Sequence, residues 1–185
     1  KKKAWSKPMN IVATSTWLFD CVKKSSLMKN WPIHLIPYPI NTKNWKPINK
    51  LDAKSILGID PNKKVVLFGA IGGTKDTRKG SHIFEEALDI LRDSYFENIE
   101  DRIQILVFGE SSNKKFINKL PLDFLGSFSD DLSLRVIYSA ADVMVVPSIQ
   151  EAFGQTASEA HSCGTPVAAF KIGGLIDIVD HKETG

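Results

Sequence analysis

From residue 64 onward, short apolar runs alternate with stretches of helical periodicity, and this alternation limits the fold more than any other feature of the sequence. Five runs are predicted as strands: Val65–Gly69, Ile103–Phe108, Phe124–Leu125, Asp142–Val146 and Val167–Phe170. The stretches after them are predicted as helices: Ser81–Arg92, Lys114–Lys119, Asp130–Ala140, Gln155–Cys163 and a last helix from Leu175. Strands that are apolar throughout are typical of parallel sheets covered on both faces. The sequence therefore predicts an α/β fold with a Rossmann-like, doubly wound parallel sheet.

The first fifty residues have a different pattern. Two strands and a helix are predicted there: Asn10–Ala13, Thr16–Met28 after an N-cap at Ser15, and Ile33–Ile36. Three prolines then mark an extended connection that ends near Lys50, and a short helix is predicted over Leu51–Leu57. We therefore expect residues 1–50 to be the end of one domain with an inter-domain linker, and residues 51–185 to be the doubly wound domain.

Composition excludes several classes of function. The chain has 185 residues, of which 43% are hydrophobic, enough for one packed domain. Its net charge of +3 equals the charge of the first three lysines, so nothing indicates a nucleic-acid partner. The two cysteines and four histidines lack the spacing of a metal site. No apolar run approaches the ~18 residues of a membrane-spanning helix, and no signal peptide is visible.

Two carboxylates lie eight positions apart across the predicted turn from strand to helix near residue 150. Gly154 permits the turn, Glu151 precedes the helix, and Glu159 lies in it, roughly 8 Å along the axis. A helix N-terminus at the carboxyl end of a parallel strand favours a pyrophosphate. A carboxylate at each end of that pyrophosphate could accept hydrogen bonds from a sugar and from a ribose. The alternative is that Glu151 only complements the helix dipole and Glu159 is a solvated helix residue.

Many residues around this pair recur in one known group of enzymes. They are Gly126–Phe128, Ile137–Asp142, Pro147–Ser148, Phe153–Gly154, Ala160, Cys163–Val167, Gly173–Gly174 and Thr184–Gly185, with Val65–Ala70, Arg78–Gly80, Thr14–Trp17 and Ile36–Asn41 upstream. Together with the two glutamates, they closely resemble the retaining glycosyltransferases of family 4, which have the two-domain GT-B fold. The resemblance implies the C-terminal, nucleotide-sugar-binding domain, a remnant of the N-terminal domain, and truncation before the closing helices.

The resemblance also implies roles for individual residues. Glu151 and Lys79 are implied as catalytic: Glu151 holds and orients the donor sugar, and Lys79 neutralises the diphosphate. Glu159 is implied to hold the ribose hydroxyls. The remaining implied binding residues are Arg78, Phe153, Gly154, Gln155, Thr156, Phe128 and Gly73. The family commonly has an arginine directly after the first strand's glycine, where this chain has Ala70, and Arg78 is the candidate substitute.

Four features of the sequence can be explained either by ligand binding or by ordinary structure. The glycine-rich, basic loop 69–80 fits neither the dinucleotide fingerprint nor the P-loop, so it can also be a flexible surface loop. Phe128 can stack on a base or belong to the core. Gly173 and Gly174 can admit a ligand close to the backbone or form an ordinary loop. The four tryptophans are predicted to cover a domain junction, although Trp45 could also hold a sugar.

By resemblance, the expected reaction is transfer of a hexose from a UDP-, GDP- or ADP-sugar to an acceptor hydroxyl with retention of configuration. The expected setting is polysaccharide or glycolipid biosynthesis, with no metal or other cofactor. A sugar or lipid-linked acceptor would bind through the largely absent N-terminal domain, so this piece alone should be inactive. We expect a cytoplasmic location, with membrane contact only through absent parts. The alternatives are a sugar-nucleotide epimerase of the same fold and a non-catalytic nucleotide-binding domain.

Overall fold

The computed structural model describes residues 5–69, 76–94, 98–112, 116–117 and 119–185, and these contain a six-stranded sheet with the order β5-β6-β4-β3-β7-β8. Its strands are β3 (Lys64–Gly69), β4 (Ile103–Phe108), β5 (Phe116–Ile117), β6 (Leu120–Gly126), β7 (Val143–Val146) and β8 (Val167–Ala169). All neighbouring strands are parallel except β5 and β6. The predicted α/β fold with a parallel sheet is therefore confirmed.

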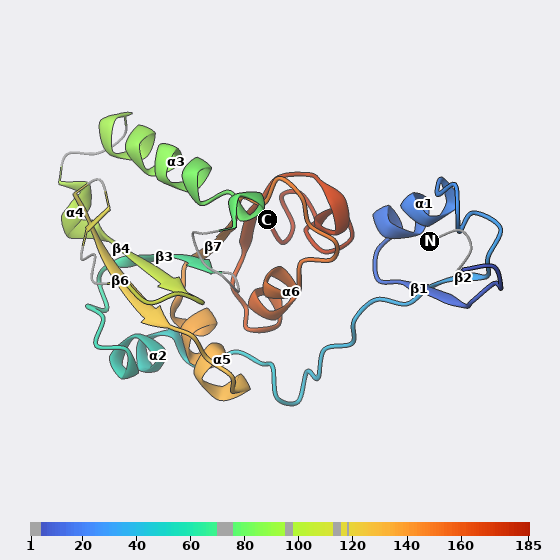
Figure 1. Ribbon diagram of the computed structural model, residues 1–185. Helices are drawn as coiled ribbons and strands as arrows, with labels where there is room; N and C mark the ends of the chain where they lie inside the picture. Colours follow the sequence, from blue (N-terminus) through green and yellow to red (C-terminus); the bar gives the residue numbers. More distant parts are fainter. Residues whose placement is uncertain (1–4, 70–75, 95–97, 113–115, 118) are drawn as a thin grey trace.

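Helices cover both faces of this sheet (Figure 1). They are α2 (Lys50–Ile56), α3 (Ser81–Ser94), α4 (Ile99–Arg102), α5 (Asp131–Ala140) and α6 (Gln155–Ser162), with short 3-10 helices η2 (Thr77–Lys79) and η3 (Gly173–Asp177). Alternate side chains of β3 serve opposite faces, because successive residues of a strand point to opposite sides. Leu67 joins the core beneath α5 and α6, whereas Phe68 joins the core beneath α3, where its ring stacks on Phe84.

The strand order creates a switch point between β3 and β7. From β3 the chain moves outward to β4 and β6, and it then returns to the other side of β3 to form β7 and β8. The carboxyl ends of β3 and β7 therefore lie at the same edge of the sheet, whereas the following helices α3 and α6 pack on opposite faces. In open α/β sheets, ligands bind in the crevice that the loops after such a pair of strands leave at the carboxyl ends.

Four local predictions differ from the structure. The strand predicted over Phe124–Leu125 is part of the longer strand β6 (Leu120–Gly126). The helix predicted at Lys114–Lys119 is wrong: Phe116–Ile117 form β5, which pairs with Leu120 and Pro121 across a turn in which Lys119 has a φ of 70°. So short a segment has too few internal hydrogen bonds to favour a helix over pairing with β6. The last predicted helix is the 3-10 turn η3. The first helix, α1, ends at Lys23 rather than Met28.

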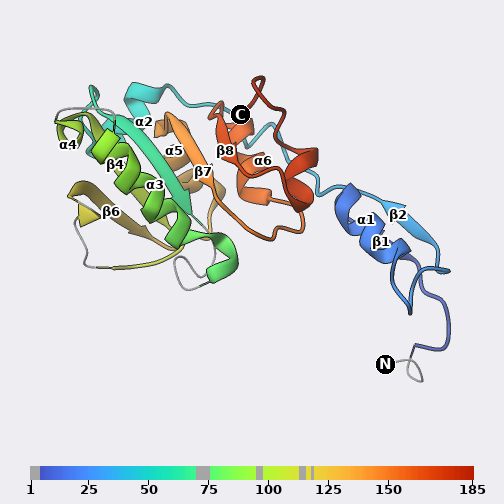
Figure 2. The same ribbon diagram turned by 90° about the horizontal axis from the view of Figure 1, so that it is seen from above.

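The N-terminal elements form a small unit of their own. They are β1 (Ile11–Ala13), α1 (Thr16–Lys23) and β2 (Ile33–Leu35), and the two strands pair in parallel. Ser15 caps α1 as predicted, since its hydroxyl accepts a hydrogen bond of 3.2 Å from the N–H of Leu18. An extended connection leads from β2 to α2, and Figures 1 and 2 show this unit beyond the C-terminal elements of the six-stranded sheet.

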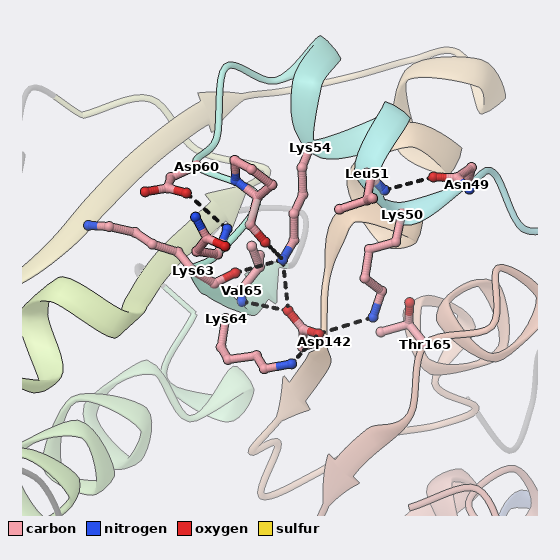
Figure 3. A network of polar contacts seen from close by, with 12 residues as sticks. Asn49, Lys50, Leu51, Lys54, Asp60, Lys63, Lys64, Val65, Asp142 and Thr165 are labelled. Carbon is pink, nitrogen blue, oxygen red and sulfur yellow. Dashed lines mark hydrogen bonds and ion pairs between the residues drawn. The ribbon is translucent and has the colours of Figure 1, made fainter.

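A charged cluster attaches α2 to the amino-terminal edge of the sheet (Figure 3). Asp142, just before β7, accepts a 2.9 Å hydrogen bond from the N–H of Val65 and pairs with Lys50 at 3.2 Å and Lys54 at 3.3 Å. The buried Lys54 ammonium also donates to the carbonyl of Lys63 at 2.6 Å. Burial raises the pKa of Asp142, but these hydrogen bonds and charges outweigh it, so the pKa lies below its ordinary value. The cluster lies at the opposite edge from the switch-point loops.

Candidate active site

The loop after β7 turns sharply into α6, as the sequence predicts. Gly154 is the N-cap of α6 and has a φ of 101°, which side chains rarely tolerate. A Cβ there would also lie 2.6 Å from a methyl group of Leu175. Gln155 and Thr156 follow as the first residues of the helix, whose opening N–H groups have no partners within it. The turn thus places a helix N-terminus at the switch point.

Lys79 and Glu151 meet at this edge although they are 72 positions apart. The ammonium of Lys79 lies 2.6 Å from Glu151 Oε2, and both side chains are largely shielded from solvent. Two backbone features bring their loops together. The N–H of Ile149 donates a 2.9 Å hydrogen bond to the carbonyl of Arg78. Gly80 has a φ of 73°, and any side chain on it would overlap the carbonyl of Pro147.

A glycine pair supports the Glu151 loop from the other side. The N–H of Gly174 donates a 2.9 Å hydrogen bond to the carbonyl of Glu151. A Cβ on Gly173 would overlap that same carbonyl, and a Cβ on Gly174 would lie 2.5 Å from the Cα of Phe153. The space that these glycines leave free of side chains is therefore filled by the backbone of the Glu151 loop.

Glu159 lies in the second turn of α6 and is buried, with only 8% of its surface exposed. Tyr138 donates a 2.8 Å hydrogen bond to Oε2, and the side-chain amide of Gln155 donates a 3.0 Å hydrogen bond to Oε1. Burial raises the pKa of Glu159, and the two hydrogen bonds offset this only in part. The alternative that Glu159 is a solvated helix residue is therefore wrong.

The extended connection forms one wall of a hollow of about 210 Å³ beside Glu159. Its lining residues are Tyr38, Pro39, Ile40, Asn41 and Trp45 on one side and Phe153, Gln155, Ser158 and Glu159 on the other. Tyr38 and Phe153 contact edge to face, with ring centroids 5.2 Å apart. Trp45 is mainly a core residue, 8% exposed, beside Tyr138. The hollow thus combines aromatic walls with one buried carboxylate.

A second hollow, of about 240 Å³, opens on the Lys79–Glu151 pair. It is lined by Trp17, Arg78, Lys79, Gln150, Glu151 and Ala152. Thr156 contributes instead to a small depression behind the pair, together with Ser148, whose hydroxyl lies 3.4 Å from Glu151 Oε2. The 240 Å³ hollow thus contains the cation–carboxylate pair just before α6, and the 210 Å³ hollow contains Glu159 and other residues of α6.

Of the other residues predicted to bind the donor, one lines a hollow, one does not, and one lies outside the described residues. Arg78 lines the 240 Å³ hollow, but its guanidinium makes a bidentate pair with Asp76, at 3.0 and 2.8 Å. This pairing, chiefly through its hydrogen bonds, lowers the pKa of Asp76. Phe128 is partly buried and packs against the core beneath α5 and α6, and it lines neither hollow. Gly73 lies outside the described residues.

Tyr138 has no role predicted from the sequence, and Trp17 is predicted only to cover a domain junction. Tyr138 holds Glu159, and a signal for it existed, because a tyrosine on the apolar face of a predicted helix needs a buried partner for its hydroxyl. Trp17 borders the hollow at Lys79 and Glu151. Nothing local to Trp17 indicates this position, since it depends on contact with residues more than sixty positions away.

Two negative findings apply to the described ranges. They contain no cluster of three or more histidine, cysteine, aspartate or glutamate side chains arranged to hold a metal ion. Among the helices in these ranges, none is both long and apolar enough to cross a lipid bilayer.

Solved structures with the same architecture define the class of protein. Sucrose-phosphate synthase from Thermosynechococcus elongatus superposes with a TM-score of 0.79 and 30% identity, over 100% of this chain and 46% of that protein. HepE of Anabaena, solved in complex with UDP-glucose, superposes with a TM-score of 0.64 and 22% identity over 92% of this chain and 47% of that one. The fold is that of the C-terminal domain of a GT-B glycosyltransferase.

Sequence comparison gives the family. Residues 63–185 match the family described as "Glycosyl transferases group 1", and the chain belongs to it. D-inositol 3-phosphate glycosyltransferase of Pseudarthrobacter chlorophenolicus is 34% identical over 165 residues, which are 83% of this chain and 37% of that protein. The chain thus spans a little over a third of the length of the curated relatives of this kind that it matches.

Proposed function

We propose that this chain is the donor-binding part of a retaining glycosyltransferase of family 4, which transfers a hexose from a nucleoside diphosphate sugar to an acceptor hydroxyl. One observation carries the proposal: the ion pair between Lys79 and Glu151 lies at the switch point, and the buried Glu159 lies one helical turn further on. A carboxylate paired with a cation, together with a second, buried carboxylate in the following helix, matches a ligand with a hydroxyl-bearing ring at each end and a diphosphate between them.

In this proposal each group binds one part of the donor. Lys79 and the first N–H groups of α6 take the diphosphate, where charge-assisted hydrogen bonds are strongest. Glu159, fixed by Tyr138 and Gln155, accepts hydrogen bonds from the ribose hydroxyls. Glu151 accepts hydrogen bonds from the hexose. As the glycosidic bond breaks, the ring gains positive charge and the leaving diphosphate gains negative charge, so Glu151 and Lys79 stabilise opposite ends of the transition state.

The ion pair between Lys79 and Glu151 then has a function in the donor-free state. It keeps each charge partnered before the donor binds, which lowers the cost of burying either one. A diphosphate competes with Glu151 for the ammonium, and the sugar hydroxyls compete with Lys79 for the carboxylate. Donor binding therefore exchanges one ion pair for two sets of charge-assisted hydrogen bonds. Charge neutralisation by Lys79 and Arg78 is part of the proposal, with no metal assigned.

The acceptor, a sugar or a lipid-linked sugar, is assigned to parts of the enzyme outside this sequence, in line with the greater length of its relatives. We therefore expect the chain to bind the donor and not to transfer the sugar. Membrane association, if the enzyme has it, also belongs to those parts.

The proposal is tested by calorimetric titration of the chain with UDP, GDP and ADP and with UDP-glucose, GDP-mannose and ADP-glucose. One base should bind clearly better than the other two, and its diphosphate should bind better than its nucleoside. Absence of binding by all six ligands would contradict the proposal. For the full-length enzyme, released diphosphate with a new glycoside indicates transfer, whereas an isomerised sugar on an intact nucleotide would indicate an epimerase.

A further inference from the structure

We propose that Trp17 is the aromatic wall against which the hexose of the donor packs, opposite Glu151. This inference rests on the proposed function and extends it to a residue of the N-terminal unit. Trp17 is half-buried and lines the 240 Å³ hollow together with Lys79 and Glu151. Among the described residues that line the hollow, Trp17 is the one aromatic residue and the one residue of the first fifty.

The start of α1 is fixed to the C-terminal elements by three hydrogen bonds. Asp177 of η3 accepts hydrogen bonds from both the backbone N–H of Thr16, at 2.7 Å, and its hydroxyl, at 2.5 Å. The hydroxyl of Ser15, which is fully buried, donates a 2.6 Å hydrogen bond to the carbonyl of Ala152. Trp17 follows these two residues directly. Its backbone is therefore held beside the Glu151 loop, and the indole cannot leave the hollow without breaking these contacts or changing rotamer.

The lining of the hollow selects the kind of ligand. The lining combines a planar apolar ring with a carboxylate and an ammonium, so it has an apolar part and a charged part. A hexopyranose matches this division, because its ring has faces of C–H bonds and a rim of hydroxyls. Aromatic faces attract such weakly positive hydrogens. A phosphate group would fit this part of the hollow less well than a sugar, because the carboxylate of Glu151 would repel its negative charge.

The size of the hollow agrees with a single sugar ring. Sites for drug-sized ligands have volumes of roughly 300–1,000 Å³, and this hollow, at about 240 Å³, is smaller. The diphosphate is assigned to the border of this hollow, where Lys79 and the start of α6 can bind it. Trp17 should therefore contribute to binding of the nucleotide-sugar and not to binding of the nucleoside diphosphate.

The test compares the two ligands on matched variants. Trp17→Ala and Trp17→Phe are titrated with UDP and with UDP-glucose, or with the corresponding GDP or ADP pair if the wild-type chain selects that base. Trp17→Ala should weaken the nucleotide-sugar about tenfold and leave the nucleoside diphosphate unchanged, whereas Trp17→Phe should retain most of the affinity. Trp5→Ala removes an exposed tryptophan that does not line the hollow, and it should change neither affinity.

A spectroscopic measurement covers the case in which Trp17→Ala unfolds. The indole N–H resonance of Trp17 in the wild-type chain, assigned by its absence from Trp17→Phe, should shift with UDP-glucose and not with UDP. Equal weakening of both ligands by Trp17→Ala, or equal shifts with both, would overturn the inference and leave the proposed function intact. No effect of either kind would also overturn it. Failure of the wild-type chain to bind any nucleotide would instead refute the proposed function, and the inference with it.

Discussion

The phenol of Tyr138 donates a 2.8 Å hydrogen bond to Glu159 Oε2, so the acid assigned to the ribose is held by the hydrophobic core. Tyr138 is fully buried in α5 between the rings of Trp45 and Phe108. Its own carbonyl accepts a 2.6 Å hydrogen bond from the hydroxyl of Thr165. Glu159 therefore has a fixed orientation before any ligand arrives, which reduces the entropy cost of binding.

Tyr138→Phe should weaken nucleotide binding about three- to tenfold, because Glu159 loses one of its two positioning hydrogen bonds. The hydrogen bond from Tyr138 lowers the pKa of Glu159, so its removal should raise that pKa further. The pH at which nucleotide affinity begins to fall on acidification should then be higher in the variant. Calorimetry between pH 4 and 8 measures both effects. Trp5→Phe, at an exposed ring that lines neither hollow, is the control. An unchanged pH profile in Tyr138→Phe would contradict the positioning role.

Glu159→Gln should lose nucleotide affinity without losing stability. The pKa of Glu159 is raised by burial, so the folded chain holds this proton more tightly than the unfolded chain, and ionisation destabilises the fold as pH rises through the raised pKa. At pH 7 the amide removes that cost, and the free energy of unfolding should be equal or higher. Affinity should fall about ten- to a hundredfold, or roughly 1.4–2.8 kcal/mol.

Glu159→Ala is the informative comparison. It removes the acceptor of the buried Tyr138 hydroxyl and leaves a cavity, so it should lower the melting temperature as well as the affinity. Denaturant unfolding of both variants separates the two effects. If Glu159→Gln binds nucleotide normally, the carboxylate has only a structural role.

Lys79→Ala should weaken binding of a nucleoside diphosphate by about 1.5–3 kcal/mol, the usual contribution of a charge-assisted hydrogen bond. Binding of the corresponding nucleoside should change little, because Lys79 pairs with Glu151, whereas the ribose is assigned to Glu159. Titration of both ligands checks this, with Lys43→Ala, an exposed lysine of the connection, as the control. Equal losses for both ligands would indicate that Lys79 only stabilises the loop.

Glu151→Gln in the full-length enzyme should lower kcat strongly. The amide keeps the shape of the side chain but removes the charge that the positively charged ring of the transition state requires. Affinity for the bare diphosphate should stay equal or increase, because Lys79 loses its competing partner. Single-turnover kinetics and calorimetry measure the two quantities. Near-normal turnover would refute the catalytic role of Glu151.

Asp142→Asn should destabilise the fold by about 1.5–3 kcal/mol, since the buried Lys54 ammonium loses its counter-ion. The folded pKa of Asp142 is lowered, so its ionised form contributes stability fully above the unfolded pKa, near 3.9, and loses this contribution as pH falls through the folded value. The deficit of the variant should therefore shrink below about pH 4. Urea unfolding at pH 3 and 7 checks this. Lys64→Ala, which removes a partner that is 73% exposed, should have little effect.

The strand pattern and the turn chemistry are local properties, and the sequence was sufficient to predict them. Strand β4 has the bounds Ile103–Phe108 that were predicted from its apolar run. Asp130 is the N-cap of α5, at the position where a helix was predicted to begin. Local pattern failed at Lys114–Lys119, where pairing between Phe116–Ile117 and β6 replaced the predicted helix. A segment of that length has weak intrinsic preference, so a neighbouring strand decides its conformation.

The sequence by itself determined the parallel α/β fold, the turn at Gly154 and the presence of two glutamates on one loop and helix, because all of these depend on residues close together in the chain. Only the tertiary structure decided that Lys79 pairs with Glu151, that Tyr138 holds a buried Glu159, and that Trp17 faces the same hollow. These contacts join segments that are 21 to more than 130 positions apart. Their geometry depends on how the strands order themselves and how the helices pack, which no local periodicity encodes.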